Sequence, residues 1–81
     1  MGKMKSLSGK DVVKVFAKFG FGIVSQRGSH AKLQRIVAGD ERQTLTIPLH
    51  EDLDKGTLKA IYRQSLRYIP AELLKANFYT A

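Results

Sequence analysis

One histidine of this chain lies beside residues that reactions on phosphate esters require. His30 directly follows the turn-forming pair Gly28-Ser29. Arg27 precedes that turn, and Lys32 comes two residues after the histidine. An imidazole can both accept and donate a proton near neutral pH, and cations stabilise a phosphodiester and the more highly charged transition state of its cleavage. This grouping could support proton transfer at a phosphodiester, and the alternative, a turn histidine without a catalytic role, stays open on these residues alone.

Few other residues in the sequence are arranged for chemistry. The chain has no cysteine, so disulfides, thiolate zinc sites, iron–sulfur clusters and a cysteine nucleophile are excluded. No glycine-rich loop has the spacing of a P-loop or of a dinucleotide-binding loop. Glu51, Asp52 and Asp54 are interpreted as a solvated acidic loop before a helix. The role of His50 stays open, and one alternative is a loop residue that bonds backbone carbonyls near Pro48. We therefore predict no metal site and no cofactor.

The segments around His30 alternate between helical and strand periodicity. Ser8 and Asp11 form the [ST]-x-x-[DE] pattern of a helix start, and Gly20 is placed to end that helix. The apolar stripe between them is interpreted as core: Val12, Val13, Phe16 and Phe19. After Gly20 the apolar period changes to two, which indicates strands over residues 21–27, 30–37 and 42–47. The short turns between these strands predict an antiparallel meander.

Alternation along the second and third predicted strands separates a buried face of the sheet from an open one. The side chains expected to face the helices are Ala31, Leu33, Val37, Leu45 and Ile47, with Arg35 as a charged exception. The opposite face is polar and carries His30, Lys32, Gln34, Arg42, Thr44 and Thr46. The sheet is therefore expected to have one basic face open to solvent, with His30 on it.

The remainder of the chain predicts two helices after the sheet. The first begins around Gly56-Thr57, and its apolar positions are Leu58, Ile61, Tyr62, Leu66 and Ile69. Pro70 suits the first turn of a further short helix. The fold class is α+β: a small sandwich in which helices cover one face of a three-stranded antiparallel sheet. The 81 residues predict one domain, with a core over about residues 5–69 and a C-terminal extension over 70–81.

The charge of the chain is strongly uneven. The net charge is +7, and the segment from Ala38 onward contributes none of it, because its six cations meet six anions. Lys10, Lys14 and Lys18 follow one another at i, i+4 and i+8 along one side of the first helix. Such a basic half favours a polyanion as partner. The simpler alternative is that the basic residues only keep a small domain in solution.

The composition indicates a globular domain that folds in water. Hydrophobic residues make up 43% of the chain and charged residues 26%, which argues against disorder. No apolar run approaches the roughly 20 residues of a membrane-spanning helix. The basic N-terminal residues are not followed by an apolar stretch, so we expect no secretory signal and a cytoplasmic protein.

Five short motifs along the chain occur together in one known family. They are Leu7-Ser8-Gly9-Lys10-Asp11, Gly20-Phe21, Gly28-Ser29-His30, Ile47-Pro48-Leu49-His50 and Gly56-Thr57-Leu58-Lys59-Ala60-Ile61. In this order and spacing, over residues 5–69, the chain resembles the HicA family, the small toxins of bacterial and archaeal toxin–antitoxin pairs. It is longer than the usual family member at both ends, by residues 1–3 and by the tail from residue 75.

The resemblance implies a fold like that of double-stranded-RNA-binding domains, in the order α-β-β-β-α. That order agrees with the one inferred above from periodicity. The resemblance also implies cleavage of mRNA without the ribosome, dependent on one histidine, and neutralisation by a HicB-type antitoxin. The family's functional histidine corresponds to His30.

These residues lead to a hypothesis for the mechanism. RNA is expected to bind the basic open face mainly through its phosphates. The residues expected to bind RNA are Arg27, Ser29, Lys32, Lys10 and Lys14. Neutral His30 takes the proton from a ribose 2′-OH, which attacks the adjacent phosphorus and leaves a 2′,3′-cyclic phosphate without the help of a metal. With one acid–base residue in the hypothesis, water is expected to supply the proton of the leaving group.

Two other classes of function stay open at this stage. A non-catalytic double-stranded-RNA-binding module would contact duplex phosphates from the start of its last helix. There only Lys55 and Lys59 oppose the acidic loop of Glu51, Asp52 and Asp54. A protein-interaction domain would use the basic face for an acidic partner alone. Incubation with a structured and an unstructured RNA separates the three classes by cleavage, by duplex binding without cleavage, or by neither.

Overall fold

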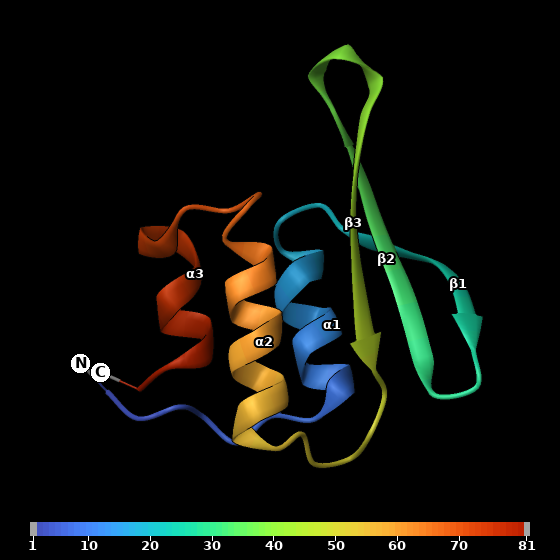
Figure 1. The fold of residues 1–81 in the computed structure, drawn as a ribbon. Helices are drawn as coiled ribbons and strands as arrows, with labels where there is room; N and C mark the ends of the chain where they lie inside the picture. The colour runs from blue at the N-terminus through green and yellow to red at the C-terminus, as the bar shows by residue number, and fades with distance from the viewer. Residues whose placement is uncertain (1, 81) are drawn as a thin grey trace.

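In a computed structural model, which describes residues 2–80, one helix precedes a three-stranded sheet and two helices follow it (Figure 1). The elements are α1 (Gly9–Ala17), β1 (Gly22–Arg27), β2 (His30–Val37), β3 (Glu41–Pro48), α2 (Lys55–Ser65) and α3 (Ala71–Phe78), with a short 3₁₀ turn at Ala38–Asp40. The strand order is β1-β2-β3, and both neighbouring pairs are antiparallel. The predicted α+β class and the α-β-β-β-α order are confirmed.

The start of α1 is formed by the residues that the sequence indicated, but its end is not: the helix stops at Ala17 with Lys18 as its C-cap, before the expected cap Gly20. The Ser8 hydroxyl accepts the Asp11 N–H at 3.0 Å, and the Asp11 carboxylate accepts the Ser8 N–H at 3.0 Å. This reciprocal capping box satisfies two N–H groups that the helix cannot pair itself. At the other end Gly20 has a φ of 90°, and the Phe21 N–H donates to the Phe16 carbonyl at 3.1 Å. The two phenyl rings then pack edge to face, 5.9 Å between centroids.

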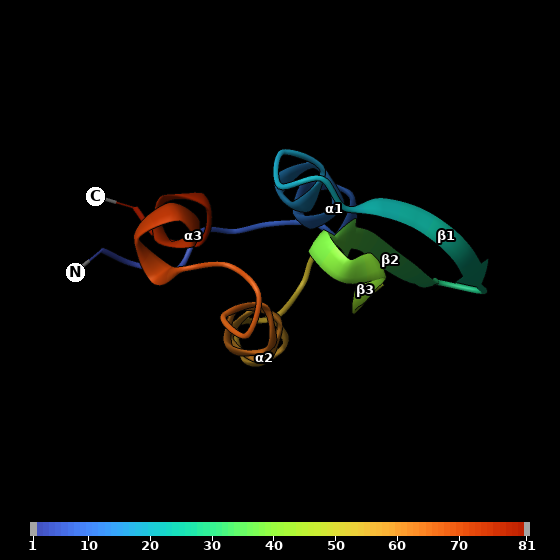
Figure 2. The same ribbon diagram turned by 90° about the horizontal axis from the view of Figure 1, so that it is seen from above.

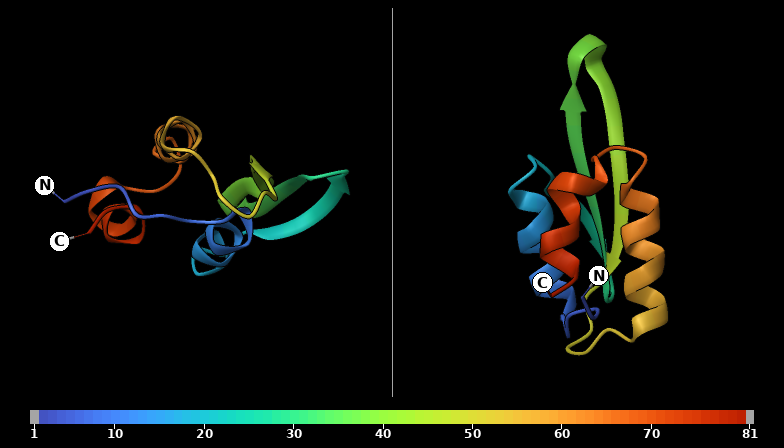
Figure 3. Two further views of the ribbon diagram at one scale, coloured as in Figure 1. Left: turned by 90° about the horizontal axis from the view of Figure 1, so that it is seen from below. Right: turned by 90° about the vertical axis from the view of Figure 1, so that its left-hand side faces the viewer.

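The strand register produces the two-faced sheet that alternation predicted. Ala31 pairs with Ile47 and Leu33 with Leu45, and all four side chains are buried. The three helices lie on this face of the sheet, as the right-hand view of Figure 3 shows. His30 and Lys32 alternate with these buried residues and are exposed on the opposite, open face.

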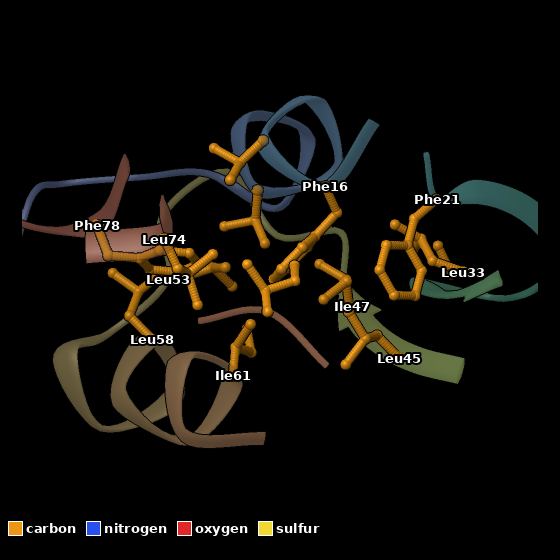
Figure 4. Packing of buried hydrophobic residues seen from close by; sticks show 14 residues of the cluster. Phe16, Phe21, Leu33, Leu45, Ile47, Leu53, Leu58, Ile61, Leu74 and Phe78 are labelled. Atoms are coloured by element: carbon orange, nitrogen blue, oxygen red, sulfur yellow. The ribbon is translucent and has the colours of Figure 1, made fainter. Parts of the chain in front are cut away.

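The core joins all three helices to the sheet. Phe16 of α1 and Ile61 of α2 lie near Ile47 of β3, whereas Phe78 and Leu74 of α3 lie at the other end of the cluster, beside Leu53 and Leu58 (Figure 4). Seen from above, α3 lies farthest from the sheet, beyond α1 and α2 (Figure 2). The ring of Phe78 lies 6.0 Å from that of Phe16 and 5.5 Å from that of Tyr62, measured between centroids. The C-terminal helix is thus part of the same core as the sheet.

Arg35, the charged residue on the buried face, is a structural residue. Its guanidinium donates to the Phe19 carbonyl at 2.8 Å, to the Tyr68 carbonyl at 2.9 Å and to the Gln43 side chain at 2.6 Å. It also lies 4.9 Å from the centroid of the Phe21 ring. These contacts tie β2 to the segments that follow α1 and α2. Arg35 therefore adds nothing to the basic open face, although the sequence counts it among the cations of the first half.

The two terminal segments pair with each other. The Lys5 N–H donates to the Phe78 carbonyl, and the Thr80 N–H donates to the Lys3 carbonyl, both at 2.8 Å. Met4 and Tyr79 form an antiparallel bridge between these bonds. Residues 3–5 and 78–80 thus hold the end of α3 against the N-terminal segment.

The second helix differs in extent from the prediction. It begins at Lys55 because Asp54 caps it, and it ends at Ser65. Leu66 and Ile69 therefore lie beyond it, and Leu66 is 38% exposed, whereas Ile69 is buried in the connection to α3. A proline disfavours helical backbone at the residue before it, which is consistent with a break in the helix at Ile69. Pro70 lies at the N-cap of α3, one residue before the first turn where it was expected.

The Asp54 cap predicts an acid-sensitive contribution to stability. Its carboxylate accepts the Thr57 N–H at 2.6 Å, and this bond, with that to the Thr57 side chain, holds the pKa of Asp54 below its ordinary value. A lowered folded-state pKa stabilises the fold above the unfolded pKa of about 3.9, and that stability is lost as the pH falls through the folded value. Asp54→Asn, which keeps an oxygen acceptor without a titrating group, should therefore lose less thermal stability on acidification.

The measurement is the melting temperature by circular dichroism from about pH 6 to pH 2. Asp52→Asn is the control, because Asp52 is an exposed residue of the same loop for which the structure shows no capping bond. Its melting curve should follow that of the wild type at each pH. Parallel pH profiles for Asp54→Asn and the wild type would show that the cap carries no acid-sensitive stability.

Candidate catalytic site

Three segments meet at the lower end of the sheet in Figure 1: the β1–β2 turn, the end of β3 and the first turn of α1. His30 is the first residue of β2, where it pairs with Arg27 of β1 and with Pro48 of β3. Gly28 makes the tight turn possible, since its φ of 55° lies in the region that favours glycine. The His30 side chain is exposed, so its imidazole is open to a large substrate.

Two predicted cations flank His30 on the open face of the sheet. Arg27 is its direct partner across the strands, and direct partners have Cβ atoms about 4.5–5.5 Å apart on the same face. Lys32 comes two residues later on that face, between Ser25 of β1 and Thr46 of β3. Both cations are exposed. The structure thus brings His30, Arg27 and Lys32 together as the sequence predicted.

The tertiary structure adds a second imidazole to this end of the sheet. The rings of His30 and His50 lie 6.4 Å apart between centroids, inclined by 70°. The His50 Nε2 lies 3.3 Å from the Ser29 hydroxyl oxygen. Of the possibilities left open for His50, the structure does not show the ring bonded to backbone carbonyls: its ring partner is the hydroxyl of Ser29. The cause is the bond from the Leu49 N–H to the Ser29 carbonyl, at 2.5 Å, which draws the residues after β3 onto the β1–β2 turn.

The first turn of α1 closes the site from the other side. The Gly9 N–H donates to the His50 carbonyl at 2.9 Å. Gly9 is buried, and a Cβ atom there would lie only 2.1 Å from the Pro48 carbonyl oxygen, so no larger residue fits without movement. This close approach of two backbones explains the glycine at the start of the helix.

Lys10 is brought to the site by the same contact, and Lys14 is not. Lys10 and His50 line one hollow of about 230 Å³, together with Ser8, Leu49 and Glu51. Lys14 is exposed one turn further along α1 and does not line this hollow. The half-buried Ser29, expected to contact RNA, has its hydroxyl at His50. The hollow thus brings the cation of Lys10 and the carboxylate of Glu51 beside His50.

His50 and Gly9 are the site residues that the sequence reasoning missed. The position of His50 could have been predicted from the sequence. Antiparallel pairing with short turns places the residues that follow the third strand beside the start of the second strand. The close approach at Gly9 has no such signal, because it depends on where α1 packs against β3.

Neither a metal-binding cluster nor a membrane-spanning helix is present among the residues that the structure describes. Within residues 2–80, no group of three or more His, Cys, Asp or Glu side chains could hold a metal ion. None of the helices formed by these residues is long and apolar enough to cross a membrane.

The model of a known protein family matches most of this chain. The model described as the HicA toxin of bacterial toxin–antitoxin matches residues 9–66. The chain belongs to the HicA toxin family. The match runs from the first residue of α1 to just past α2, so it includes the sheet, His30 and His50 and excludes α3. No curated protein and no solved structure gives a significant match to the chain.

Membership of the HicA family assigns the chain a role and a kind of partner. It is a toxin of a toxin–antitoxin system, and such a system implies an antitoxin that binds it. The paired terminal residues, 3–5 and 78–80, and the whole of α3 lie outside the family match.

The contact at Gly9 predicts a strong effect of one methyl group. Gly9→Ala places a Cβ atom against the Pro48 carbonyl and the Leu49 Cα. Overpacking of this kind should lower the free energy of unfolding by about 1–3 kcal/mol, measured by urea denaturation. Gly56→Ala is the matched control, because its Cβ would meet only the Asp54 carboxylate at 3.6 Å. Since alanine favours a helix over glycine, the control should lose no stability. Equal stability of the two variants would contradict the close approach at Gly9.

Proposed function

We propose that this HicA-family toxin is an endoribonuclease that cleaves mRNA, with His30 as the residue that accepts the proton of the attacking hydroxyl. The observation that carries the proposal is the exposed imidazole of His30 between Arg27 and Lys32 on the open face of the sheet. An imidazole supplies proton transfer, and the two cations supply the charge that a phosphodiester in reaction requires. An open face suits a long polymer better than a small molecule, which binds in enclosed pockets.

The reaction follows from the chemistry of the groups. Neutral His30 accepts the proton of a ribose 2′-OH, and the 2′-oxygen attacks the adjacent phosphorus. The bond from phosphorus to the 5′-oxygen breaks, which leaves a 2′,3′-cyclic phosphate and a 5′-hydroxyl end. Arg27 and Lys32 stabilise the extra charge on the phosphate oxygens in the transition state. Because the nucleophile belongs to the RNA itself, the proposal requires no metal ion.

Single-stranded mRNA in the cytoplasm is the proposed substrate. A flexible strand can adopt the in-line geometry that attack by the 2′-oxygen requires, whereas a duplex holds its backbone away from it. Contacts to phosphates and not to base edges are the main source of affinity in this proposal. The exposed cations of the open face are consistent with such contacts.

Removal of His30 tests the catalytic part of the proposal. His30→Ala should keep its affinity for single-stranded RNA and cleave it about 10²–10⁴-fold more slowly, because it lacks the proton acceptor. Rates are measured on an end-labelled RNA, with the 2′,3′-cyclic phosphate identified by mass spectrometry. The matched control is Thr46→Ala, on the same face of the sheet, which should cleave like the wild type. Cleavage by His30→Ala at the wild-type rate, or wild-type cleavage that stops in EDTA, would contradict this mechanism.

The two cations beside His30 should control binding. The double variant Arg27→Gln/Lys32→Gln should bind RNA more weakly, and its affinity should depend less on salt. The slope of log K against log salt should be smaller by about 0.7 for each lost phosphate contact on a single strand. Fluorescence anisotropy at several salt concentrations measures both effects.

A matched variant with the same change in charge distinguishes the duplex-binding alternative. Lys55→Gln/Lys59→Gln removes two exposed cations from the start of α2, beside the acidic loop of Glu51, Asp52 and Asp54. It should bind single-stranded RNA like the wild type. If this variant loses affinity and the one at Arg27 and Lys32 does not, RNA binds the helix and the open face is not the RNA-binding surface.

The antitoxin is proposed to be a HicB-type protein that covers His30 and the basic open face. Acidic or polar groups of such a partner would occupy the positions of the RNA phosphates, so one surface would serve both partners. The variant at Arg27 and Lys32 should therefore also weaken the complex with the antitoxin, measured by calorimetry. An unchanged affinity of that variant for the antitoxin would place the partner on another surface.

A further inference from the structure

The main chain around His50 is held on both sides, while its imidazole faces solvent. The His50 carbonyl accepts the Gly9 N–H, and the preceding Leu49 N–H donates to the Ser29 carbonyl. Both of these bonds belong to the backbone, so the connection between α1, β3 and the β1–β2 turn does not need an imidazole at position 50. The ring itself is exposed, and its hydrogen-bond partner is the Ser29 hydroxyl at 3.3 Å.

We propose that His50 is a second catalytic residue, which donates a proton to the 5′-oxygen as that oxygen leaves the phosphorus. This inference rests on the proposed function and replaces the water expected from the sequence. The protons balance within the pair. His30 takes one from the 2′-OH, and the imidazolium of His50 gives one to the 5′-oxygen. The products are a 2′,3′-cyclic phosphate, a 5′-hydroxyl end, a protonated His30 and a neutral His50, and water returns both histidines to their starting states.

The separation of the two rings suits one phosphodiester. An acid–base residue needs a hydrogen bond of about 2.6–3.2 Å to the oxygen that it serves. With the rings inclined by 70° and 6.4 Å between centroids, a phosphate lying over the pair is within such reach of both. The two imidazoles would then serve two different oxygens of the same phosphorus. Arg27 lies beside His30, and Lys10 lines the same hollow as His50, so each oxygen has a nearby cation.

Ser29 is suited to hold a histidine that changes its protonation state. The hydroxyl oxygen accepts a hydrogen bond from Nε2–H of the imidazolium, and it accepts the same bond after Nδ1 has given up its proton. With Nε2 at Ser29, Nδ1 is the nitrogen that faces the leaving oxygen. This gives Ser29 a positioning role in place of the phosphate contact expected from the sequence.

A pair of substrates separates a proton donor from a residue that merely binds or supports the fold. The first is a single-stranded RNA, whose 5′-alkoxide leaves poorly without a proton. The second is uridine 3′-(4-nitrophenyl phosphate), whose nitrophenolate leaves without one. His50→Ala should cleave the RNA about 10²–10⁴-fold more slowly and cleave the nitrophenyl ester at the wild-type rate. His30→Ala should lose activity on both substrates, because both reactions need the 2′-oxygen.

Controls distinguish the failure of this inference from that of the proposed function. His50→Gln should behave like His50→Ala, since an amide does not supply the proton, and Asp52→Asn in the same loop should match the wild type. Unfolding curves confirm that each variant is folded. A wild-type rate of RNA cleavage by His50→Ala, or an equal loss on both substrates, overturns the role of His50 and leaves that of His30 intact. Full activity of His30→Ala, or no cleavage by the wild type, overturns the proposed function and this inference together.

Discussion

The close approach of the first turn of α1 to the end of β3 is the constraint on which the candidate site depends. At Gly9 there is no room for a side chain, and the N–H of that glycine holds the carbonyl of His50. One residue earlier the Leu49 N–H holds the β1–β2 turn through Ser29. Because both bonds run between main-chain groups of different elements, the two histidines take their relative position from the fold and not from their own side chains.

The sheet separates two uses of positive charge. On its buried face the guanidinium of Arg35 is surrounded by three acceptors and an aromatic ring, which satisfy its donors inside the domain. On its open face Arg27 and Lys32 keep their charges in solvent, beside His30. The net charge of the chain thus overstates the charge that faces a partner. The open face is also the surface that the proposal assigns both to RNA and to the antitoxin that family membership implies.

Most of the fold could be predicted from the sequence, because the patterns that indicate its helices and strands are local. The capping box at Ser8 and Asp11 and the change of apolar period at Phe21 each act over a few residues, and each lies where it was predicted, whereas α1 ends at Ala17, before the predicted Gly20. The predictions for α2 were less accurate at its end, because Leu66 and Ile69 continue the apolar spacing beyond Ser65. Lys3 and Lys5 pair with Thr80 and Phe78, which lie more than seventy residues away along the chain. No local pattern in the sequence predicts this pairing.

For the candidate site, the sequence by itself determined the residue types and one cluster. Arg27, Ser29, His30 and Lys32 are neighbours along the chain, so a two-residue turn and strand alternation suffice to place them together. The tertiary structure decided that His50 and Lys10 join this cluster and that Lys14 does not line it. His50 follows from the pairing of β2 with β3, whereas the positions of Lys10 and Lys14 depend on the angle and depth at which α1 packs against β3. That packing is set by the core as a whole, and neither spacing nor charge along the chain encodes it.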